Sequence, residues 1–435
     1  MSFDQTPLGA VLRERGYIRG PFGSALKRGE LLSTGIPVYE QQHAIDGTRR
    51  FRFFISQEKF DELKRFAVHA NDVIISCSGT VGRVSVIQDG DPKGVISQAL
   101  LILRPDLGQL SSPYLYYFLT SPLGQSELIR ASHGAVQQNI APRAVVEQIP
   151  VPLPSVSEQR HIVDVLKALD DRIALLRETN ATFEAIAQAL FKSWFVDFDP
   201  VRAKQQGLAP AGMDEATAAL FPDSFEEAAL GLGLVPKGWH GGALNDLADL
   251  NSQSWSGRHH PERVRYLDLA NVKDNEVAVV TEFAFAEAPS RARRVLRSGD
   301  TIVGTVRPGN RSFAFIHEPV PDLTASTGFA VLSPTVVDNT AFVYLAATQA
   351  ASIEHLSHVA DGGAYPAVRP DVVSALACVV PSAEILRAFN AVACPLLVKV
   401  SANQRQAQTL ATLRDTLLPR LISGQLRLPE AEAIA

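Results

Sequence analysis

Apolar side chains recur in alternating steps of four and three along a stretch near the middle of the chain. A helix with this spacing presents one continuous apolar stripe, which is typical of a coiled coil. Ser155 and Glu158 have the spacing of a capping box, and Pro200 interrupts helical hydrogen bonding. We therefore predict one long helix over residues 155–199. Its expected seam consists of Ile162, Leu166, Leu169, Ile173, Leu176, Asn180, Phe183, Ala187, Leu190 and Trp194.

The same pattern returns near the end of the chain at a constant offset, with Phe389 in the place of Ile162. Nine of the ten matching positions can face a seam, and Pro419 predicts that the last turn kinks or ends early. The two helices are thus one element written twice. The matching positions are Phe389, Ala393, Leu396, Val400, Asn403, Ala407, Leu410, Arg414, Leu417 and Leu421.

A helix of some 40 residues spans roughly 60 Å, so each of these helices can act as a spacer. Two copies related by a pseudo-twofold axis pair antiparallel, and facing residue numbers then have a constant sum. Asn180 and Asn403 sum to 583, as do Leu176 and Ala407. We predict that the asparagines meet in mid-seam and fix the register. The alternative is that each lies at an exposed edge.

A repeat with a nearly identical offset also covers the stretches before the helices. Short apolar segments, Val95 to Leu103 and Phe329 to Leu332, precede boundaries marked by proline in each copy. The predicted fold class is α+β: two mixed domains, each with a curved, antiparallel-rich sheet and flanking helices, and two long antiparallel coiled-coil helices. The matching positions are 71–74 with 299–302, Gly134 with Gly362, Pro142 with Pro370, and Val145 with Val373.

Five segments follow from these patterns. Residues 200–234 have the composition of a tether with one short helix, and the second globular domain opens at the motif VPKGW, 235–239. The predicted segments are a first globular domain 1–154, a first long helix 155–199, a linker 200–234, a second globular domain 235–381 and a second long helix 382–426.

The cysteine content and the hydropathy of the chain exclude several classes of protein. Cys77, Cys378 and Cys394 have no CxxC spacing and no nearby histidine cluster, so we expect buried thiols without a disulfide framework or a metal site. We find no secretory leader and no apolar run near the roughly 20 residues of a membrane helix. A globular cytoplasmic protein without a membrane partner is the expectation.

The formal charge of −5 at pH 7 argues at first against nucleic acid, whose binders usually carry a basic surplus. The acidic excess is uneven, however. Residues 1–150 hold 16 Lys and Arg against 14 Asp and Glu, residues 151–235 hold 7 against 13, and residues 236–380 hold 12 against 15. If the second domain binds DNA, its cations must therefore cluster in loops or its partners must share the contact.

Motifs of the common nucleic-acid enzymes are missing from the chain. We find no GxxxxGK[ST] phosphate loop, no GxGxxG after a strand, no HExxH and no methyltransferase tetrapeptide of the Asn-Pro-Pro-aromatic kind. His259, His260 and Glu262 form a metal cluster only if a loop folds them together, and a surface loop is the simpler interpretation. We expect no catalytic residue, no metal and no cofactor bound by this chain.

Polar and basic loops occur at similar places in both repeats. Cations seek phosphate, amides can pair with adenine edges, and an arginine fork fits the edge of guanine. Any one of these residues could equally belong to an ordinary solvated loop. The candidate DNA-binding residues are Lys27, Arg28, Gln41, Gln42, Arg49, Arg50, Arg52, Gln137, Gln138, Asn139, Arg258, His259, Arg307, Arg311 and Tyr365.

Three aromatic residues, Trp194, Phe195 and Phe198, lie at the end of the first long helix. They could form a platform on which bases stack. Packing in a core at the root of the coiled coil is the favoured interpretation.

Several segments resemble the specificity subunits of type I restriction-modification systems. The helices and linker carry most of the resemblance, and it covers essentially the whole chain in the family's order. The matching segments are LFKSWFVDFDPVRAK at 190–204, TAALFPDSFEE at 217–227, VPKGW at 235–239, NQRQAQTLATLRDTLLPRLISGQL at 403–426, GPFGS at 20–24 and IPVPLPSVSEQ at 149–159.

The resemblance implies a non-catalytic protein with two target-recognition domains that bind a split site on double-stranded DNA, one half-site per domain. It implies two methyltransferase subunits that use S-adenosylmethionine, and restriction subunits that use ATP and Mg. The alternatives are a coiled-coil scaffold that does not bind DNA and a fused methyltransferase.

Overall fold

The computed structural model describes the chain except for residues 1, 23–24, 131, 134–138, 228–232 and 428–435. It contains two compact units. The first comprises residues 1–173 and 408–435, and the second comprises residues 174–407. These units differ from the five predicted segments because each long helix contributes to both of them.

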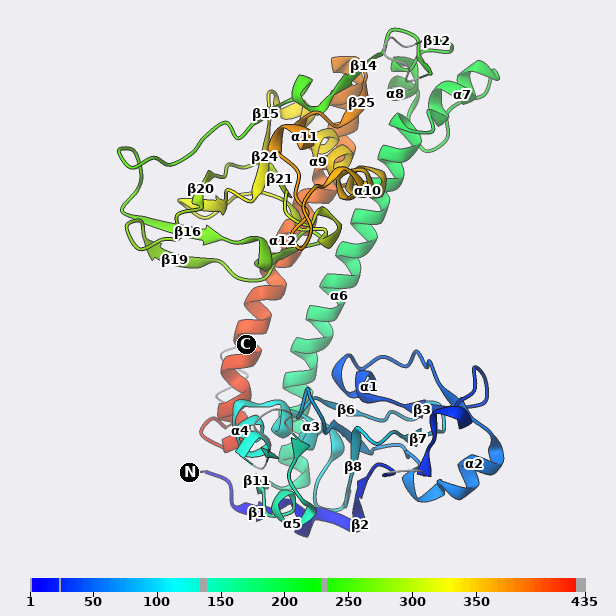
Figure 1. Ribbon diagram of the computed structural model, residues 1–435, viewed down its shortest axis with the longest axis vertical. Helices are drawn as coiled ribbons and strands as arrows, with labels where there is room; N and C mark the ends of the chain where they lie inside the picture. The colour runs from blue at the N-terminus through cyan, green and yellow to red at the C-terminus, as the bar shows by residue number, and fades with distance from the viewer. Residues whose placement is uncertain (1, 23–24, 131, 134–138, 228–232, 428–435) are drawn as a thin grey trace. The chain divides into compact units, whose positions relative to one another are not determined.

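Two helices are far longer than the rest, α6 (Val156–Phe195) and α12 (Ala383–Ser423) (Figure 1). The predicted capping box starts α6: the Ser155 backbone N–H donates to Glu158 Oε2 at 3.2 Å, and the Glu158 N–H donates to Ser155 Oγ at 3.3 Å. After α6 the backbone turns at Phe198, whose φ is 56°, and α7 (Asp199–Gln205) begins with Pro200 in its first turn.

The helix α12 passes through Pro419 and ends four residues later at Ser423, before the predicted end at 426. Leu417 and Leu421, on either side of the proline, are fully buried in the core of the first unit. Burial of these side chains offsets the backbone hydrogen bond that proline removes. By length and composition alone α12 is also apolar enough to cross a membrane, contrary to the sequence expectation. Much of its apolar surface packs inside the two cores.

In the second unit the two helices meet at the asparagines. Asn403 Nδ2 donates to Asn180 Oδ1 at 2.9 Å, and Asn180 Nδ2 donates to the carbonyl of Val400 at 3.2 Å. Both side chains are buried. The prediction that the asparagines pair in mid-seam is confirmed, and the alternative of two exposed edges is wrong.

Most of the seam residues named from the sequence are buried, and one position is shifted. In α12, Leu396 is half-buried while its neighbour Leu397 is fully buried, so the seam position there is Leu397. Leu410 is half-buried in the first unit, and Arg414 pairs with Asp170 at 2.7 Å. Phe183 and Leu190 of α6 are also only half-buried. The other named positions are buried: Ile162, Leu166, Leu169, Ile173, Leu176, Asn180, Ala187, Trp194, Phe389, Ala393, Val400, Asn403, Ala407, Leu417 and Leu421.

The globular part of the first unit is built on a four-stranded antiparallel sheet of order β2-β8-β5-β6: β2 (Leu12–Arg19), β8 (Leu100–Pro105), β5 (Val73–Ser76) and β6 (Val84–Val86). A smaller sheet joins β4 (Phe54–Ile55), β3 (Ile36–Tyr39) and β7 (Val95–Ile96), with β3 parallel to β7. Strand β1 (Gln5–Pro7) pairs with β11 (Pro150–Pro152), and β9 (Ser132–His133) with β10 (Asn139–Ile140). The helices are α1 (Gln41–Ile45), α2 (Gln57–Glu62), α3 (Ser112–Thr120), α4 (Pro122–Arg130) and α5 (Arg143–Val146).

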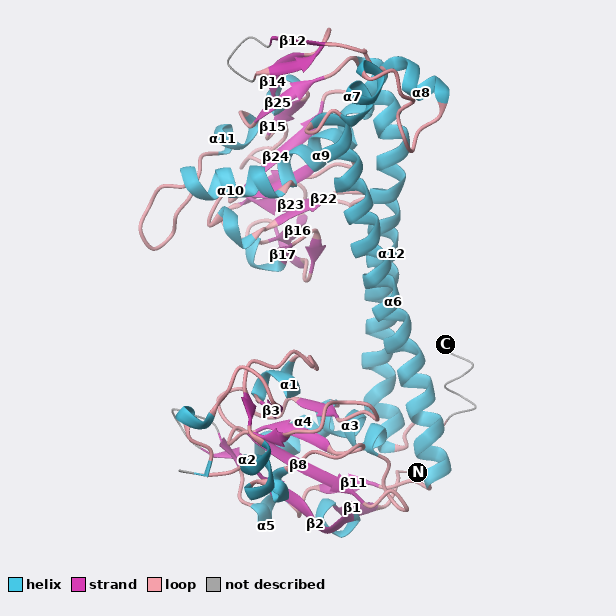
Figure 2. Cartoon of the chain, turned by 90° about the vertical axis from the view of Figure 1, so that its right-hand side faces the viewer, coloured by secondary structure: helices cyan, strands magenta, loops and turns pink. Residues whose placement is uncertain are grey.

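The second unit repeats this plan with the sheet order β15-β24-β21-β22: β15 (Ala248–Leu250), β24 (Phe329–Pro334), β21 (Thr301–Gly304) and β22 (Phe313–Phe315). Its other sheet joins β19 (Thr281–Ala284), β16 (Arg263–Leu267), β23 (Leu323–Ser326) and β20 (Ala292–Val295), with β16 parallel to β23. Strand β14 (His240–Ala243) pairs with β25 (Ala377–Val380), β17 (Val272–Lys273) with β18 (Glu276–Val277), and β12 (Phe225–Glu227) with β13 (Leu234–Pro236). The helices are α8 (Glu215–Leu220), α9 (Thr340–Thr348), α10 (Ala350–Val359) and α11 (Pro370–Ser374) (Figure 2).

The repeat predicted from the sequence extends to single side chains. Asp72 and Asp300 occupy matching positions, and both are buried before the matching strands β5 and β21. Each accepts a hydrogen bond from the backbone three residues earlier, at 2.8 Å and 2.7 Å. The residues before them, Asn71 and Gly299, both have positive φ. The predicted α+β fold with an internal repeat is confirmed.

The stretch 200–234 is more ordered than the predicted tether with one short helix. It contains α7 and α8, and Val201 and Phe221 are buried. They join a core in which Trp194, Phe195 and Phe198 pack edge to face against neighbouring rings. The interpretation of these three aromatics as core residues is confirmed.

The cysteines among the described residues are free. Cys77 is buried as expected, whereas Cys378 and Cys394 are only half-buried. Burial raises the pKa of the Cys77 thiol to about 12, which keeps it protonated.

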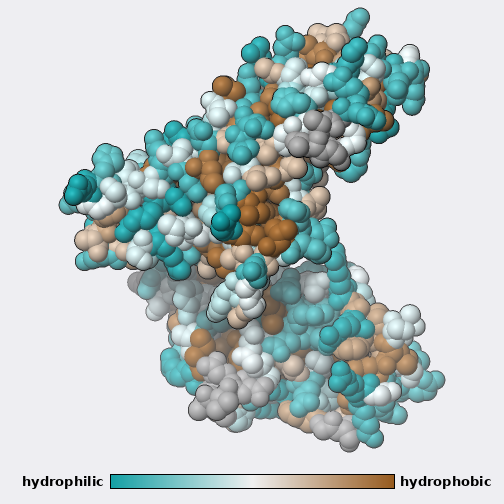
Figure 3. Space-filling view, turned by 45° about the horizontal axis from the view of Figure 1, so that its top comes forward, coloured by the Kyte–Doolittle hydropathy of each residue, from teal (hydrophilic) through white to brown (hydrophobic). Residues whose placement is uncertain are grey.

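The molecular face drawn in Figure 3 mixes hydrophilic residues with smaller hydrophobic patches.

Candidate nucleic-acid interface

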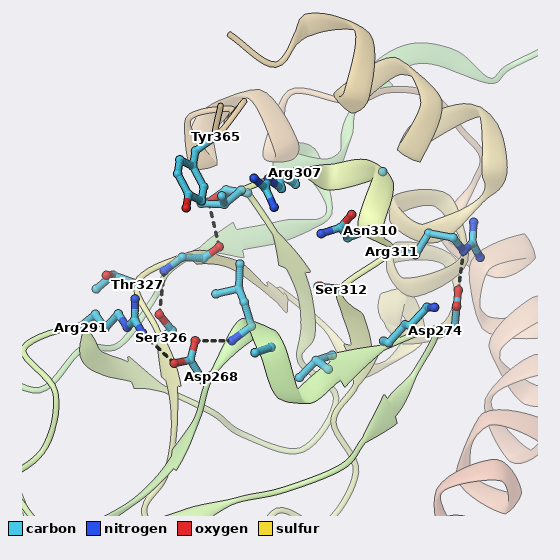
Figure 4. Close-up of a pocket in the computed structure, with 18 residues that line it drawn as sticks. Asp268, Asp274, Arg291, Arg307, Asn310, Arg311, Ser312, Ser326, Thr327 and Tyr365 are labelled. Atoms are coloured by element: carbon cyan, nitrogen blue, oxygen red, sulfur yellow. Dashed lines mark hydrogen bonds and ion pairs between the residues drawn. The ribbon is translucent and has the colours of Figure 1, made fainter. Parts of the chain in front are cut away.

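A groove of about 1140 Å³ opens on the second unit, and we call it the arginine groove (Figure 4). Backbone and side chains from the ends of β16, β21 and β23 and from the loops beside them form its walls. Four cationic side chains and two carboxylates line it, which gives the groove a positive balance. These charged residues are Lys273, Arg291, Arg307, Arg311, Asp268 and Asp274.

The loop between β21 and β22 carries two arginines in the left-handed region of backbone conformation. Arg307 has a φ of 49° and Arg311 a φ of 60°, on either side of the short 3-10 turn Pro308–Asn310. Such a conformation costs a residue with a Cβ about 1 to 3 kcal/mol, and this kind of strain concentrates at functional sites. The loop therefore holds two strained cations at the edge of the groove.

Arg307 is held by a second loop. Its Nη2 donates to the Ala364 carbonyl at 2.7 Å, and its guanidinium carbon lies 4.6 Å from the centre of the Tyr365 ring. The backbone N–H of Arg307 donates to the Pro366 carbonyl at 2.7 Å. Tyr365 is itself 71% exposed, so the stacked pair of arginine and tyrosine faces solvent.

The other two arginines of the groove are paired with its carboxylates. Arg311 forms an ion pair with Asp274. Arg291 Nη2 lies 2.8 Å from Asp268, and its Nε donates to the Tyr266 hydroxyl at 3.0 Å. The hydrogen bond with Tyr266, together with the charge of Asp268, raises the pKa of Arg291. These pairs fix the arginines in place but reduce the free charge that they offer.

The chemistry of the arginine groove suits a nucleic acid. A guanidinium with free N–H groups can donate twice to the O6 and N7 edge of guanine, and the exposed Asn310 amide can both donate and accept. Cations around them can contact phosphate oxygens. Of the residues predicted from the sequence, the structure brings Arg307, Arg311 and Tyr365 together here.

In the first unit, the predicted residues between 27 and 42 differ in exposure and in their hydrogen bonds within the protein. Lys27 and Arg28 are exposed. Gln41 Nε2 donates to the Ser78 carbonyl at 2.7 Å and to the Thr80 carbonyl at 3.2 Å, so its amide holds the loop between β5 and β6. Gln42 is half-buried.

The three predicted arginines of the 49–52 stretch also differ. Arg49 is engaged within the unit: its Nε pairs with Asp91 at 2.8 Å, and its two terminal nitrogens bond to carbonyls and to Ser85. It stabilises the fold of this loop, and its N–H groups are used there rather than offered to DNA. Arg50 is exposed, and Arg52 pairs with Glu40 at 3.1 Å.

The remaining predicted residues are spread over other places. Asn139 is exposed in β10 and forms an isolated bridge with Ser78, whereas Gln137 and Gln138 lie outside the described residues. Arg258 and His259 are exposed on a turn and do not line the arginine groove. Next to them, the His260 ring stacks on Phe285 with centroids 3.9 Å apart. Across the described ranges no three metal-binding side chains gather, at His259 and His260 or elsewhere.

Sequence reasoning missed the acidic and polar side of the groove. Asp268, Lys273 and Asp274 line it, but they come from a different sheet and a hairpin far from Arg307 in the sequence. The one local signal was the dipeptide of Asp274 and Asn275, a pair of residues that favours a tight turn.

The comparisons with known proteins agree with this architecture. Residues 25–185 match the family model described as the type I restriction modification DNA specificity domain. The HindI specificity subunit of Haemophilus influenzae is 25% identical over 400 residues, which covers 79% of this chain and 84% of that protein. The MjaIX specificity subunit of Methanocaldococcus jannaschii is 24% identical over 327 residues, with 73% and 70% covered.

The fold is also that of a solved structure. A type I restriction-modification S subunit from M. genitalium aligns over 97% of this chain and 96% of its own, with a TM-score of 0.59 and 15% sequence identity. At this level of identity the likeness concerns the fold. The chain is therefore similar in sequence to type I restriction enzyme specificity subunits over most of its length, and residues 25–185 match the model of their DNA specificity domain.

Proposed function

We propose that the chain supplies DNA sequence specificity to a type I restriction-modification complex. Each globular domain reads one half of a bipartite target on double-stranded DNA, and the helical pair separates the two readers. The observation that carries this proposal is the duplication: two domains with the same sheet order, each followed by the same long helix. A duplicated DNA-binding domain suits a target with two half-sites.

The chemistry belongs to partners in this proposal. Two methyltransferase subunits bring S-adenosylmethionine to adenines in each half-site, and restriction subunits use ATP and Mg to cut unmodified DNA in the cytoplasm. The chain itself contributes binding and orientation. This division accounts for its acidic net charge of −5, because basic partners share the DNA backbone.

Within the second domain, the arginine groove is the surface that fits base edges best. Arg307 is exposed, held by Ala364 and Tyr365, and still has N–H groups to donate. We assign it the recognition of a guanine in the second half-site. Arg311, Lys273 and Asn310 lie around it and complete the contact with bases and phosphates.

The experiment is methylation sequencing of host DNA with and without this gene, with the partner methyltransferase present in both strains. We expect a split adenine motif that disappears with the gene. Exchange of residues 1–150 for those of a relative should then change one half of the motif and leave the other half intact. An unchanged methylome would reject DNA reading and favour a scaffold that joins two domains without DNA.

A further inference from the structure

A tight hairpin lies between the arginine groove and the long helices of the second unit. Strands β17 and β18 are joined by Asp274 and Asn275, whose φ values are 46° and 65°. Two consecutive left-handed residues make the type of turn that closes a two-residue hairpin. The turn is also bonded to the loop before β22 and to β22 itself: the Asp274 N–H donates to the Arg311 carbonyl and the Asn275 N–H to the Phe313 carbonyl, both at 2.9 Å.

The side chain of Asn275 joins the sheet to one of the long helices. Only 2% of Asn275 is exposed. Its Nδ2 donates to Glu184 Oε1 of α6 at 2.6 Å, and its Oδ1 accepts the backbone N–H of Phe315 in β22 at 2.9 Å. Burial raises the pKa of the Glu184 carboxyl, and the hydrogen bond from Asn275 opposes that rise.

The backbone of the same residue reaches the other helix. Gln404 Nε2 of α12 donates to the Asn275 carbonyl at 2.8 Å. One buried residue is therefore bonded to α6, α12 and β22 at once. Bonded buried polar groups of this kind define a single arrangement, because breaking any link leaves a buried donor or acceptor unpaired.

The contacts of Asn275 lie beside the asparagine pair that sets the register of the helices. Glu184 is one turn after Asn180 on α6, and Gln404 directly follows Asn403 on α12. On the groove side, Asp274 forms the ion pair with Arg311 (Figure 4). The tip of the hairpin thus connects a cation of the arginine groove with the centre of the helical pair.

The matching position of the first repeat has a different residue. The offset that relates Asp300 to Asp72 relates Asn275 to Gly47, which has no side chain, and a Cβ placed there would meet no atom within 4 Å. The link from hairpin tip to helices is therefore a feature of the second domain and not of the repeated plan.

We infer that Asn275 is a positioning residue that locks the second recognition domain onto the helical pair in one orientation, so that the complex accepts one gap length between the half-sites. The inference rests on the proposed function. Without the hydrogen bonds of Asn275, the domain can rotate relative to its segments of α6 and α12. It can then bind a half-site that is displaced by one base pair.

The experiment uses the assembled methyltransferase complex and duplexes that carry both half-sites at the native gap, one base pair shorter and one base pair longer. The variant is Asn275→Gly, because glycine adopts the left-handed turn without strain while it removes both side-chain bonds. We expect the preference for the native gap to fall at least tenfold. The thermal midpoint is measured alongside, because a purely structural role would lower stability without changing which gap is preferred.

Matched variants distinguish the ion pair of Asp274 on the groove side from the hydrogen bonds of Asn275 on the helix side. Asp274→Gly removes the ion pair with Arg311 but keeps the links to the helices, so gap preference should persist. Glu184→Gln keeps an acceptor for Asn275 and should also preserve it, whereas Glu184→Ala should relax it. If Asn275→Gly does not fold, Glu184→Ala tests the same link from the helix side.

The outcomes distinguish the inference from the function on which it rests. If the unmodified complex methylates no bipartite site, the proposed function fails. If it methylates one gap, and folded Asn275→Gly and Glu184→Ala keep the full preference, the function stands and the positioning role of Asn275 is rejected.

Discussion

The loops that follow β5 and β21 both contain left-handed residues, but the side chains at these positions differ. Two left-handed residues occur in each loop. In the first domain they are Gly79 and Gly82, with φ of 70° and 84°, and in the second they are Arg307 and Arg311. Glycine adopts this conformation without strain, whereas arginine does not. The comparison teaches that both loops need left-handed backbone after the strand, and that the second domain accepts strain there while it holds two cations.

In the first domain, the loop after β5 is held by hydrogen bonds from a glutamine side chain. Gln41 binds two carbonyls of the loop, and Ser78 bridges to Asn139 at the position where Val306 bridges to Ala367 in the second domain. The bridge that ties this loop to a later segment is therefore shared by both domains. In the proposed function, a common backbone with different side chains suits two half-sites that differ in sequence.

The largest expected effect breaks the helical pair that both domains share. Leu169→Asp in the first unit and Leu397→Asp in the second each place a charge in a buried seam, and we expect a loss of at least 2 to 5 kcal/mol in the free energy of unfolding, about the cost of Leu→Ala in a core. Urea unfolding and gel filtration with the partners measure it. Leu175→Asp, on a residue 51% exposed, is the control, and Leu396→Asp should cost less than Leu397→Asp. Stable, fully assembling Leu397→Asp would contradict the seam.

The next prediction tests whether the loop after β21 contributes to the specificity of one half-site only. Arg307→Ala should relax specificity for one position of the second half-site by about 1 to 3 kcal/mol and leave the first half-site unchanged, because the lost contact is a base edge. Binding to duplexes with single substitutions in each half measures it. Arg369→Ala is the control, since that arginine is exposed and outside the groove. An equal loss at both halves would reject the assignment.

A smaller effect tests the strain itself. Arg307→Gly should have a free energy of unfolding about 1 kcal/mol above that of Arg307→Ala, which removes the same side-chain contacts, and Gly79→Ala should lower it by a similar amount, because only glycine is free of strain at a positive φ. The space around Gly79 is open, so the added Cβ reports the backbone alone. Denaturant unfolding gives both values. Two changes of the same sign would show that contacts of the side chain, and not the backbone, decide them.

The smallest effect concerns a carboxyl that has no counterpart in the other domain. Burial raises the pKa of Glu184, so the folded state holds its proton more tightly than the unfolded state does. Its contribution to stability is therefore complete below the unfolded pKa and declines as pH rises through the folded pKa. Glu184→Gln should remove this decline, so that the variant gains stability relative to the natural chain as the pH rises above the unfolded pKa. Thermal unfolding at a series of pH values measures it, and parallel curves for the two proteins would contradict it.

Parts of the chain could be predicted because their signals are local or periodic. The heptad steps predicted both long helices, the constant sum paired Asn180 with Asn403, and the constant offset between matching positions predicted the repeated domains. Of the candidate site, Arg307, Arg311 and Tyr365 were found from composition, and they do meet in one groove. Arg49 is a cation in a predicted loop as well, but it forms an ion pair with Asp91 inside its own unit. No local sequence pattern encodes this difference.

Sequence by itself determined the periodic and duplicated features, because heptad spacing, capping and repetition act through neighbours in the chain. Only the tertiary structure decided which polar groups are used inside the protein. Whether Gln41 holds a loop, whether Leu397 replaces Leu396 in the seam, and whether Asn275 joins a sheet to two helices depends on segments far apart in sequence. Their hydrogen bonds and burial exist only after the chain has folded, since the partners come from different elements.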